Sequence, residues 1–305
     1  MPLQLHTVSF LSGGITLTGH LRVPDSPGPL PAVVFTGALS SVKEQTAGYY
    51  AAALSERGYI TLAFDHRNFG ESGGTPRQHE DSAGKLADLT DATSYLANHP
   101  AVDARRIGCV GICMGASYAL RHTAFDPRIS ALALVAGGYP SPGAMRAAMG
   151  ASVYRSQLAA LAAVAERSFR TAETAYMPVV SADSGEAVMP GEEPWAYYGT
   201  DRAASPGWSN RLTRLSLREI LTGYNTWAAE FVSPTPVLMV HGSTDAYCPP
   251  EDAKAVFDTL GEPKQILWLP TSNHIDLYDN PEFVTPAVDR IATWFGAHLS
   301  LGDNA

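Results

Sequence analysis

Residues 107–120 are Ile107-Gly108-Cys109-Val110-Gly111-Ile112-Cys113-Met114-Gly115-Ala116-Ser117-Tyr118-Ala119-Leu120. The first half of this stretch is a short apolar run, which is typical of a strand buried on both faces. The second half is rich in small residues that suit a helix. Cys113 lies at the junction, inside the pattern Gly-x-Cys-x-Gly. This spacing predicts a sharp turn from a strand into a helix at Cys113.

The two glycines of this pattern have a steric role. In such a turn the residues two before and two after the centre nearly touch, and glycine removes the side chains that would collide, while the central residue adopts a strained backbone conformation. The central side chain is then exposed above the sheet at a helix N-terminus, which favours negative charge. A thiol there ionises readily and attacks carbonyl carbon. The alternative is that Cys113 is simply a small buried apolar residue.

The bulk composition limits the class of protein. The chain has 305 residues, 45% of them hydrophobic and 17% charged, which suits one globular domain with an insertion. Its formal net charge is -9 and it has no basic run, so we expect neither a nucleic acid nor a membrane as a partner. Its first residues lack the features of a signal peptide, no stretch is apolar for long enough to span a bilayer, and three cysteines do not suit a disulfide framework. We therefore expect a cytoplasmic protein.

Strand and helix patterns alternate along most of the chain. A predicted hairpin, residues 3–10 and 15–24, comes first. Buried strands are predicted at residues 31–37, 59–65, 107–112, 129–137, 235–242 and 264–270, and helices at about 45–57, 88–97, 114–120, 250–260 and 284–298. This order predicts an α/β fold in which a mostly parallel, eight-stranded sheet has helices on both faces.

The alternation stops between residues 141 and 233. A connection of this length usually has a function of its own, so we predict a helical lid at 141–233 inserted into a core formed by 1–140 and 234–305. Helical patterns cover residues 158–170 and 211–221. The lid carries an aromatic group that we expect to line the substrate pocket, or alternatively to fix the lid to the core: Trp195, Tyr197, Tyr198 and Trp208.

Sites in parallel sheets lie beyond the carboxyl ends of the strands. A cysteine nucleophile needs a base, and His274 follows the last predicted strand directly. The base needs a carboxylate to fix its tautomer, and Asp245 follows the preceding strand. Cys113, Asp245 and His274 occur in the chain order of an α/β-hydrolase triad. The alternative base is His241, and the alternative acids are Glu251 and Asp252.

An oxyanion hole needs two N–H donors. We expect one from Met114, which follows the nucleophile, and the other from Ala38 or Leu39 after the third predicted strand. The alternative is that residues 37–41 form a plain turn. No cluster of His, Cys and Asp has the sequence spacing of metal ligands, so we expect no metal and no cofactor.

These motifs resemble those of dienelactone-hydrolase-like α/β-hydrolases, in the branch that includes fungal polyketide transferases and many bacterial hydrolases. The resemblance covers about residues 1–140 and 234–300 and implies a Cys-His-Asp triad. It rests on residues 42–48, 62–65, 70–74, 106–108 and 111–115 and on the loops of Asp245 and His274. Dienelactone hydrolases proper have a glutamate at the end of the third strand. This chain has Gly37 there and Glu44 further along.

We therefore expect an enzyme that hydrolyses an ester, a thioester or a lactone through an acyl-thioester on Cys113. One alternative is an acyltransferase that moves a polyketide or another acyl group to an alcohol or amine. Another is a non-catalytic ligand-binding protein on the same fold. The expected partner is a small-molecule acyl substrate, free or carrier-bound, and the sequence is compatible with a homodimer.

Overall fold

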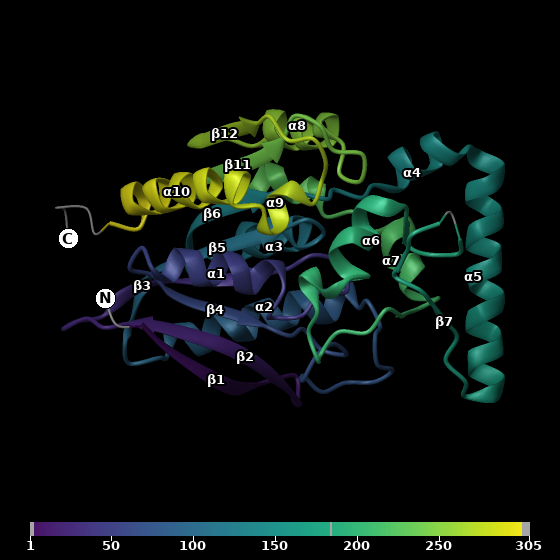
Figure 1. Cartoon of the computed structure of the whole chain (residues 1–305), viewed down its shortest axis with the longest axis horizontal. Coiled ribbons are helices and arrows are strands. Elements are labelled where there is room, and N and C mark those ends of the chain that lie inside the picture. Colours follow the sequence, from purple (N-terminus) through teal and green to yellow (C-terminus); the bar gives the residue numbers. More distant parts are fainter. Residues whose placement is uncertain (1–2, 184, 301–305) are drawn as a thin grey trace.

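The computed structural model describes residues 3–183 and 185–300, and the outermost residues of the predicted core, 1–2 and 301–305, lie outside this part. Figure 1 shows one sheet with helices on both faces and a separate group of helices at one end of the sheet. The start of β1 (Leu3–Ser12) and the end of α10 (Pro281–His298) lie at the opposite end from these helices.

The central sheet has eight strands in the order β1-β2-β4-β3-β5-β6-β11-β12. The hairpin β1–β2 and the pair β2–β4 are antiparallel, and all pairs from β4 to β12 are parallel. This confirms the predicted sheet. The strands are β1 (Leu3–Ser12), β2 (Ile15–Pro24), β3 (Leu30–Thr36), β4 (Ile60–Phe64), β5 (Val102–Ile112), β6 (Ile129–Val135), β11 (Val237–Gly242) and β12 (Lys264–Leu269).

Helices cover both faces because the central strands are apolar on both sides. The middle of β3 and the second half of β5 are fully buried. Helix α1 packs against α10 on one face, and α2 packs against α3 on the other. The helices of the core are α1 (Thr46–Ser55), α2 (Ser82–Ala97), α3 (Gly115–Phe125), α8 (Pro250–Thr259), α9 (Asp276–Asp279) and α10 (Pro281–His298).

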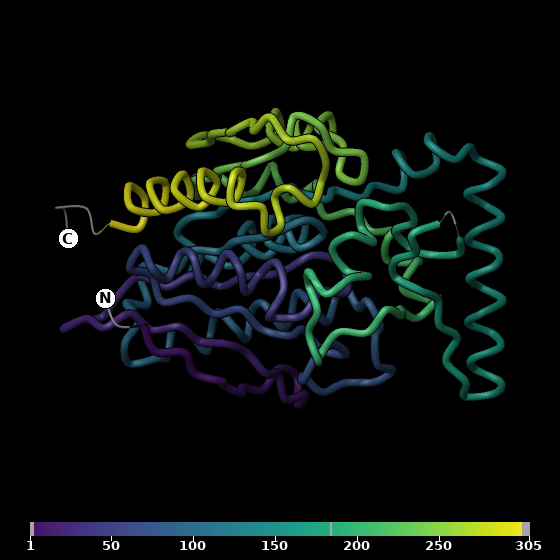
Figure 2. Tube along the Cα trace, viewed as in Figure 1, coloured from purple at the N-terminus to yellow at the C-terminus, as the bar shows by residue number. Residues whose placement is uncertain are grey.

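The segment between β6 and β11 forms the separate group of helices, shown in teal and green in Figure 2. It contains α4 (Pro142–Met149), α5 (Ala151–Thr171), α6 (Glu192–Tyr198), α7 (Ser216–Thr222), the 3₁₀ helices η1 (Asp201–Ala203) and η2 (Thr226–Phe231), and the short strands β7 (Tyr176–Met177), β8 (Val180–Ser181), β9 (Met189–Pro190) and β10 (Leu212–Thr213). The helix expected at 211–221 begins only at Ser216, because Leu212 and Thr213 pair with β7.

The long helix α5 has little core of its own. Only Tyr154 and Leu161 are buried along it, and they pack with Leu221 of α7 in a small cluster apart from the main core. No helix in residues 3–183 and 185–300 is long and apolar enough to cross a membrane.

Candidate active site

Cys113 lies in the strand-to-helix turn between β5 and α3. Its φ is 54°, the left-handed conformation that such a turn requires, and its N–H donates to the carbonyl of Val135 at 3.0 Å. A side chain at Gly111 would lie 2.6 Å from the Cα atom of Ala116, and one at Gly115 would lie 2.3 Å from the carbonyl oxygen of Thr36. Both glycines are therefore required by close backbone contact, for the steric reason inferred from the sequence.

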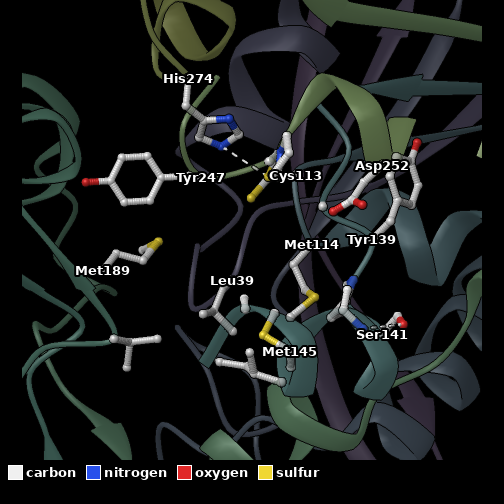
Figure 3. Close-up of a pocket in the computed structure, with 18 residues that line it drawn as sticks. Leu39, Cys113, Met114, Tyr139, Ser141, Met145, Met189, Tyr247, Asp252 and His274 are labelled. Atoms are coloured by element: carbon white, nitrogen blue, oxygen red, sulfur yellow. Dashed lines mark hydrogen bonds between the residues drawn. The ribbon is translucent and has the colours of Figure 1, made fainter. Parts of the chain in front are cut away.

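The loops after β11 and β12 bring two further predicted residues to this turn. The Nδ1 atom of His274 lies 2.6 Å from Oδ2 of Asp245, and both side chains are buried. A ring nitrogen of His274 and the sulfur of Cys113 lie within 4.8 Å of each other. Figure 3 shows the imidazole ring directed toward Cys113 at the end of a cavity. The structure thus brings Cys113, His274 and Asp245 together in the order that a proton relay needs.

Electrostatic contacts favour the charged forms of the thiol and the imidazole. The pKa of Cys113 is held well below its usual value by a hydrogen bond from Cys248 and by the charge of His274, which outweigh the effect of burial. Burial lowers the pKa of His274, but the Cys113 thiolate and the Asp245 carboxylate outweigh it and raise that pKa to about 10. Both shifts favour the thiolate–imidazolium form of the pair over its neutral form.

Met114 and Leu39, two of the residues predicted to donate N–H groups to an oxyanion, lie at the cavity. Met114 and Leu39 both line the cavity next to Cys113, whereas Ala38 is buried and does not line it. Within residues 3–183 and 185–300, no acceptor takes a hydrogen bond from the N–H of Met114 or of Leu39. Of the two donors considered for the loop after β3, the geometry favours Leu39 over Ala38.

The cavity beyond Cys113 has a volume of about 330 Å³ and mostly apolar walls. Its apolar side chains come from α4, α7, β9 with the preceding Val188, and the core residues Leu39 and Met114. The polar groups Ser141, Tyr247 and Asp252 lie at its edges. The apolar wall is formed chiefly by Met114, Met145, Met189, Val188, Ile220 and Ala144. Methionine side chains are flexible and fill irregular space, so this wall can adapt to unbranched chains.

The aromatic residues of the predicted lid do not line this cavity, which corrects the expectation that Trp195, Tyr197, Tyr198 and Trp208 form its wall. They pack instead against the core. The rings of Tyr197 and Tyr278 are 4.9 Å apart, and Tyr198 stacks on Trp208 at 5.4 Å. The reason is that α6 turns Tyr197 and Tyr198 toward Tyr278 of α9, so these aromatics fix the lid segment to the core.

Three residues near His274 were not singled out as functional from the sequence. The hydroxyl of Tyr278 lies 2.9 Å from Nε2 of His274, and Tyr278 is four residues further along the chain. The carboxylate of Glu193 in α6 accepts hydrogen bonds from the backbone N–H groups of His274 and Ile275. Cys248 lies against His274, with its sulfur 4.0 Å from Nε2. Tyr278 follows His274 by one helical turn, a spacing that could have indicated contact.

Cys113, Cys248 and His274 also form a group of metal-ligand type, with their ligand atoms all within 4.8 Å of one another. Sequence spacing could not reveal this group, because the loops bring together residues that lie far apart in the chain. In the part of the chain that the structure describes, these are the three side chains that could together hold a soft metal ion.

The alternative residues have other roles. His241 is buried at the end of β11, where Nδ1 bonds to the carbonyl of Gly242 and the ring packs near Trp268. Asp252 lines the cavity but makes no contact with His274, and Glu251 is exposed at the start of α8. Glu44 forms an ion pair with Lys43 at 2.7 Å. It therefore does not take the place of the glutamate that dienelactone hydrolases have at the position of Gly37.

A sheet of this order, with a nucleophile turn and a histidine–aspartate pair after its last strands, defines an α/β-hydrolase. The chain belongs to the Hydrolase_4 family, described as Serine aminopeptidase, S33, which matches residues 33–280. It is therefore an enzyme of the α/β-hydrolase class. Cysteine occupies the position that serine has in the usual form of this turn.

Similar proteins cover nearly the whole chain. YcjY of Escherichia coli strain K12 is 33% identical, over 92% of this chain and 94% of its own. The polyketide transferase GrgF of Penicillium is 28% identical over 86% of both chains, and its crystal structure superposes with a TM-score of 0.83, covering 99% of this chain and 100% of that one. The thiohydrolase AneE of Aspergillus aculeatus is 26% identical, over 88% of this chain and 85% of its own.

Proposed function

We propose that this protein hydrolyses acyl thioesters, esters or lactones through an acyl-thioester on Cys113, with His274 as acid and base and Asp245 as its carboxylate partner. The observation that carries the proposal is the buried group of Cys113, His274 and Asp245 at the end of an apolar cavity. The residues between 141 and 233 would act as a lid, because α4 and α7 provide part of the cavity wall.

The reaction follows from this geometry. The Cys113 thiolate attacks the acyl carbonyl carbon, and the N–H groups of Met114 and Leu39 stabilise the oxyanion. The imidazolium of His274 protonates the leaving alcohol or thiol, which leaves an acyl-thioester on Cys113 and a neutral imidazole. The neutral imidazole then removes a proton from the attacking water, and the second oxyanion collapses to expel the Cys113 thiolate. Asp245 holds Nδ1–H throughout and stabilises each imidazolium.

Acyl transfer is a second candidate, in which an alcohol or amine replaces water in the second half of the reaction. Two relatives carry names that favour it: the polyketide transferase GrgF and the acyltransferase DrtE of Aspergillus calidoustus, which is 27% identical over 92% of this chain and 91% of its own. A mostly apolar cavity also supports it, because a bound organic acceptor would be placed next to Cys113 at high effective concentration.

The experiment that tests the proposal measures the acyl-enzyme and its products together. The protein is mixed with acetyl, hexanoyl, octanoyl and benzoyl thioesters, quenched in acid, and examined by intact mass and peptide mapping. We expect an acyl adduct on Cys113 and release of free acid, and increasing hydroxylamine should divide the product between hydroxamate and acid. Turnover of peptide substrates with no acyl adduct and no thioester hydrolysis would contradict the proposal.

The shape of the cavity predicts a preference for chain length. Met145 lines the cavity, whereas Met149, one turn further along α4, does not. A Met145→Trp substitution fills part of the space, so kcat/KM for an octanoyl thioester should fall by about tenfold or more, while that for an acetyl thioester changes little. The control is Met149→Trp on the same helix. Equal losses for both substrates would mean that the acyl chain does not occupy this cavity.

The charge state of Cys113 and His274 predicts how kcat/KM depends on pH. Because the His274 imidazolium must protonate the leaving group, kcat/KM should fall as pH rises through about 10. The thiolate persists well below the usual thiol pKa, so activity should be nearly constant across neutral pH. In Cys113→Ser the thiolate is absent and the histidine must be neutral to act as a base, so residual activity should instead rise with pH as the imidazole loses its proton. The same profile in both enzymes would argue against a thiolate–imidazolium pair.

A further inference from the structure

We propose that Cys248 is a resolving thiol for Cys113, so that a hydroperoxide entering the cavity converts the two residues into a reversible Cys113–Cys248 disulfide. The site is a modification site, and its reagents are hydrogen peroxide and small organic hydroperoxides. The inference relies on the same reactive thiolate as the proposed function, but it does not rely on any acyl chemistry.

Cys113 and Cys248 come from different loops and meet at one end of the cavity. Their sulfur atoms lie within 4.8 Å of each other, and both residues line the cavity wall. Gly138 lies between them: a Cβ atom at this position would be 3.2 Å from the sulfur of Cys248 and 3.4 Å from the carbonyl carbon of Cys113. A small peroxide in the cavity can therefore reach the sulfur of Cys113, and the sulfur of Cys248 lies beside it.

The position of Cys248 is set by the site itself. Its backbone N–H donates to Oδ1 of Asp245 at 2.7 Å, while the other oxygen of this carboxylate holds His274. The sulfur of Cys248 is 4.0 Å from Nε2 of His274. These contacts hold the Cys248 thiol beside the sulfur of Cys113, so a second thiol is in place to attack Cys113 once it is oxidised.

The chemistry balances without a further reagent. The Cys113 thiolate attacks the terminal oxygen of the hydroperoxide and forms a sulfenic acid, and the O–O bond breaks to release an alkoxide or hydroxide, which takes a proton from the His274 imidazolium and leaves as an alcohol or water. The neutral imidazole then accepts the proton of the Cys248 thiol. The Cys248 sulfur attacks the Cys113 sulfur, and hydroxide leaves and is protonated to water. The two thiols lose two electrons and two protons, and the peroxide is reduced.

The second thiol changes the outcome of oxidation. A sulfenic acid that meets no thiol is oxidised further to sulfinic and sulfonic acids, which thiol reductants do not reverse. A disulfide with Cys248 stops at the reversible stage. Cys109 cannot serve this purpose, because it is fully buried within β5 and does not line the cavity.

The test uses the full chain and hydrogen peroxide at a few molar equivalents. In the wild type we expect a mass loss of about 2 Da and a linked peptide pair containing Cys113 and Cys248, both reversed by dithiothreitol. Alkylation of Cys113 by iodoacetamide should stop after peroxide and return after reduction. In Cys248→Ala and Cys248→Ser we expect a mass gain of about 32 Da or more on Cys113 and no recovery of alkylation with dithiothreitol.

Cys109→Ala is the matched control and should behave as the wild type, and the melting temperature of each variant shows whether it is folded. Wild-type protein that gains sulfinic acid without a linked peptide, or Cys248 variants that recover as fully as the wild type, would overturn the proposal. The readouts are masses and alkylation, so the disulfide can be found in a protein that forms no acyl adduct. In that case the proposed function fails and this inference stands.

Discussion

Replacing Cys113 with alanine should lower thioester hydrolysis by roughly 10⁴- to 10⁶-fold while the protein keeps its fold, since loss of a nucleophile removes the covalent route and leaves only binding and the oxyanion donors. Cys113 is the residue at which the strained turn, the helix N-terminus and the imidazolium of His274 converge. The measurement is kcat/KM with an octanoyl thioester, together with the far-ultraviolet circular dichroism spectrum and the melting temperature.

The other cysteines provide the controls for this variant. Cys109→Ala should retain wild-type turnover, because Cys109 is buried in β5 and does not line the cavity. Limited iodoacetamide should modify Cys113 first, and the loss of activity should follow that modification in time. Activity that survives in Cys113→Ala, or inactivation that follows alkylation of Cys248 instead, would assign the nucleophile elsewhere.

The sheet and the nucleophile turn could be predicted from the sequence because their signals are local. The apolar runs that end at Thr36 and Ile112 are typical of buried strands, and glycines two residues before and two after Cys113 are typical of a tight strand-to-helix turn. The pairing of His274 with Asp245 was also within reach, since both follow the last strands and the strand ends share one edge of the sheet.

The surroundings of the site depended on information that sequence spacing does not contain. The orientation of Tyr197 and Tyr198 depends on how α6 packs on Tyr278. Helix α6 has only seven residues, so its sequence pattern does not specify which of its faces is turned toward the core. Cys248 adjoins Cys113 only because two loops fold over Gly138. For the same reason the methionine-rich wall, which joins Met114 of the turn to Met145 and Met189 from the segment between β6 and β11, could not be identified before the structure.

An Asp245→Asn substitution should lower kcat by roughly 10⁴-fold, as expected when the acid of a triad is neutralised. The structure gives a specific reason for a loss of this size. Oδ1 of Asp245 accepts the backbone N–H groups of Tyr247 and Cys248 at 2.9 and 2.7 Å, so an asparagine would keep its carbonyl oxygen there. Its NH₂ group would then face Nδ1 of His274 and force the proton onto Nε2.

With the proton on Nε2, the imidazole cannot accept a proton from water, and no carboxylate stabilises an imidazolium. The loss should therefore appear in kcat more than in KM, and the pH at which iodoacetamide modifies Cys113 should rise, because the thiolate loses its cationic partner. Asp252→Asn is the matched control, since Asp252 lines the same cavity without contacting His274, and it should retain turnover within a few-fold. Wild-type turnover in Asp245→Asn, with the fold intact, would show that another group serves as the acid.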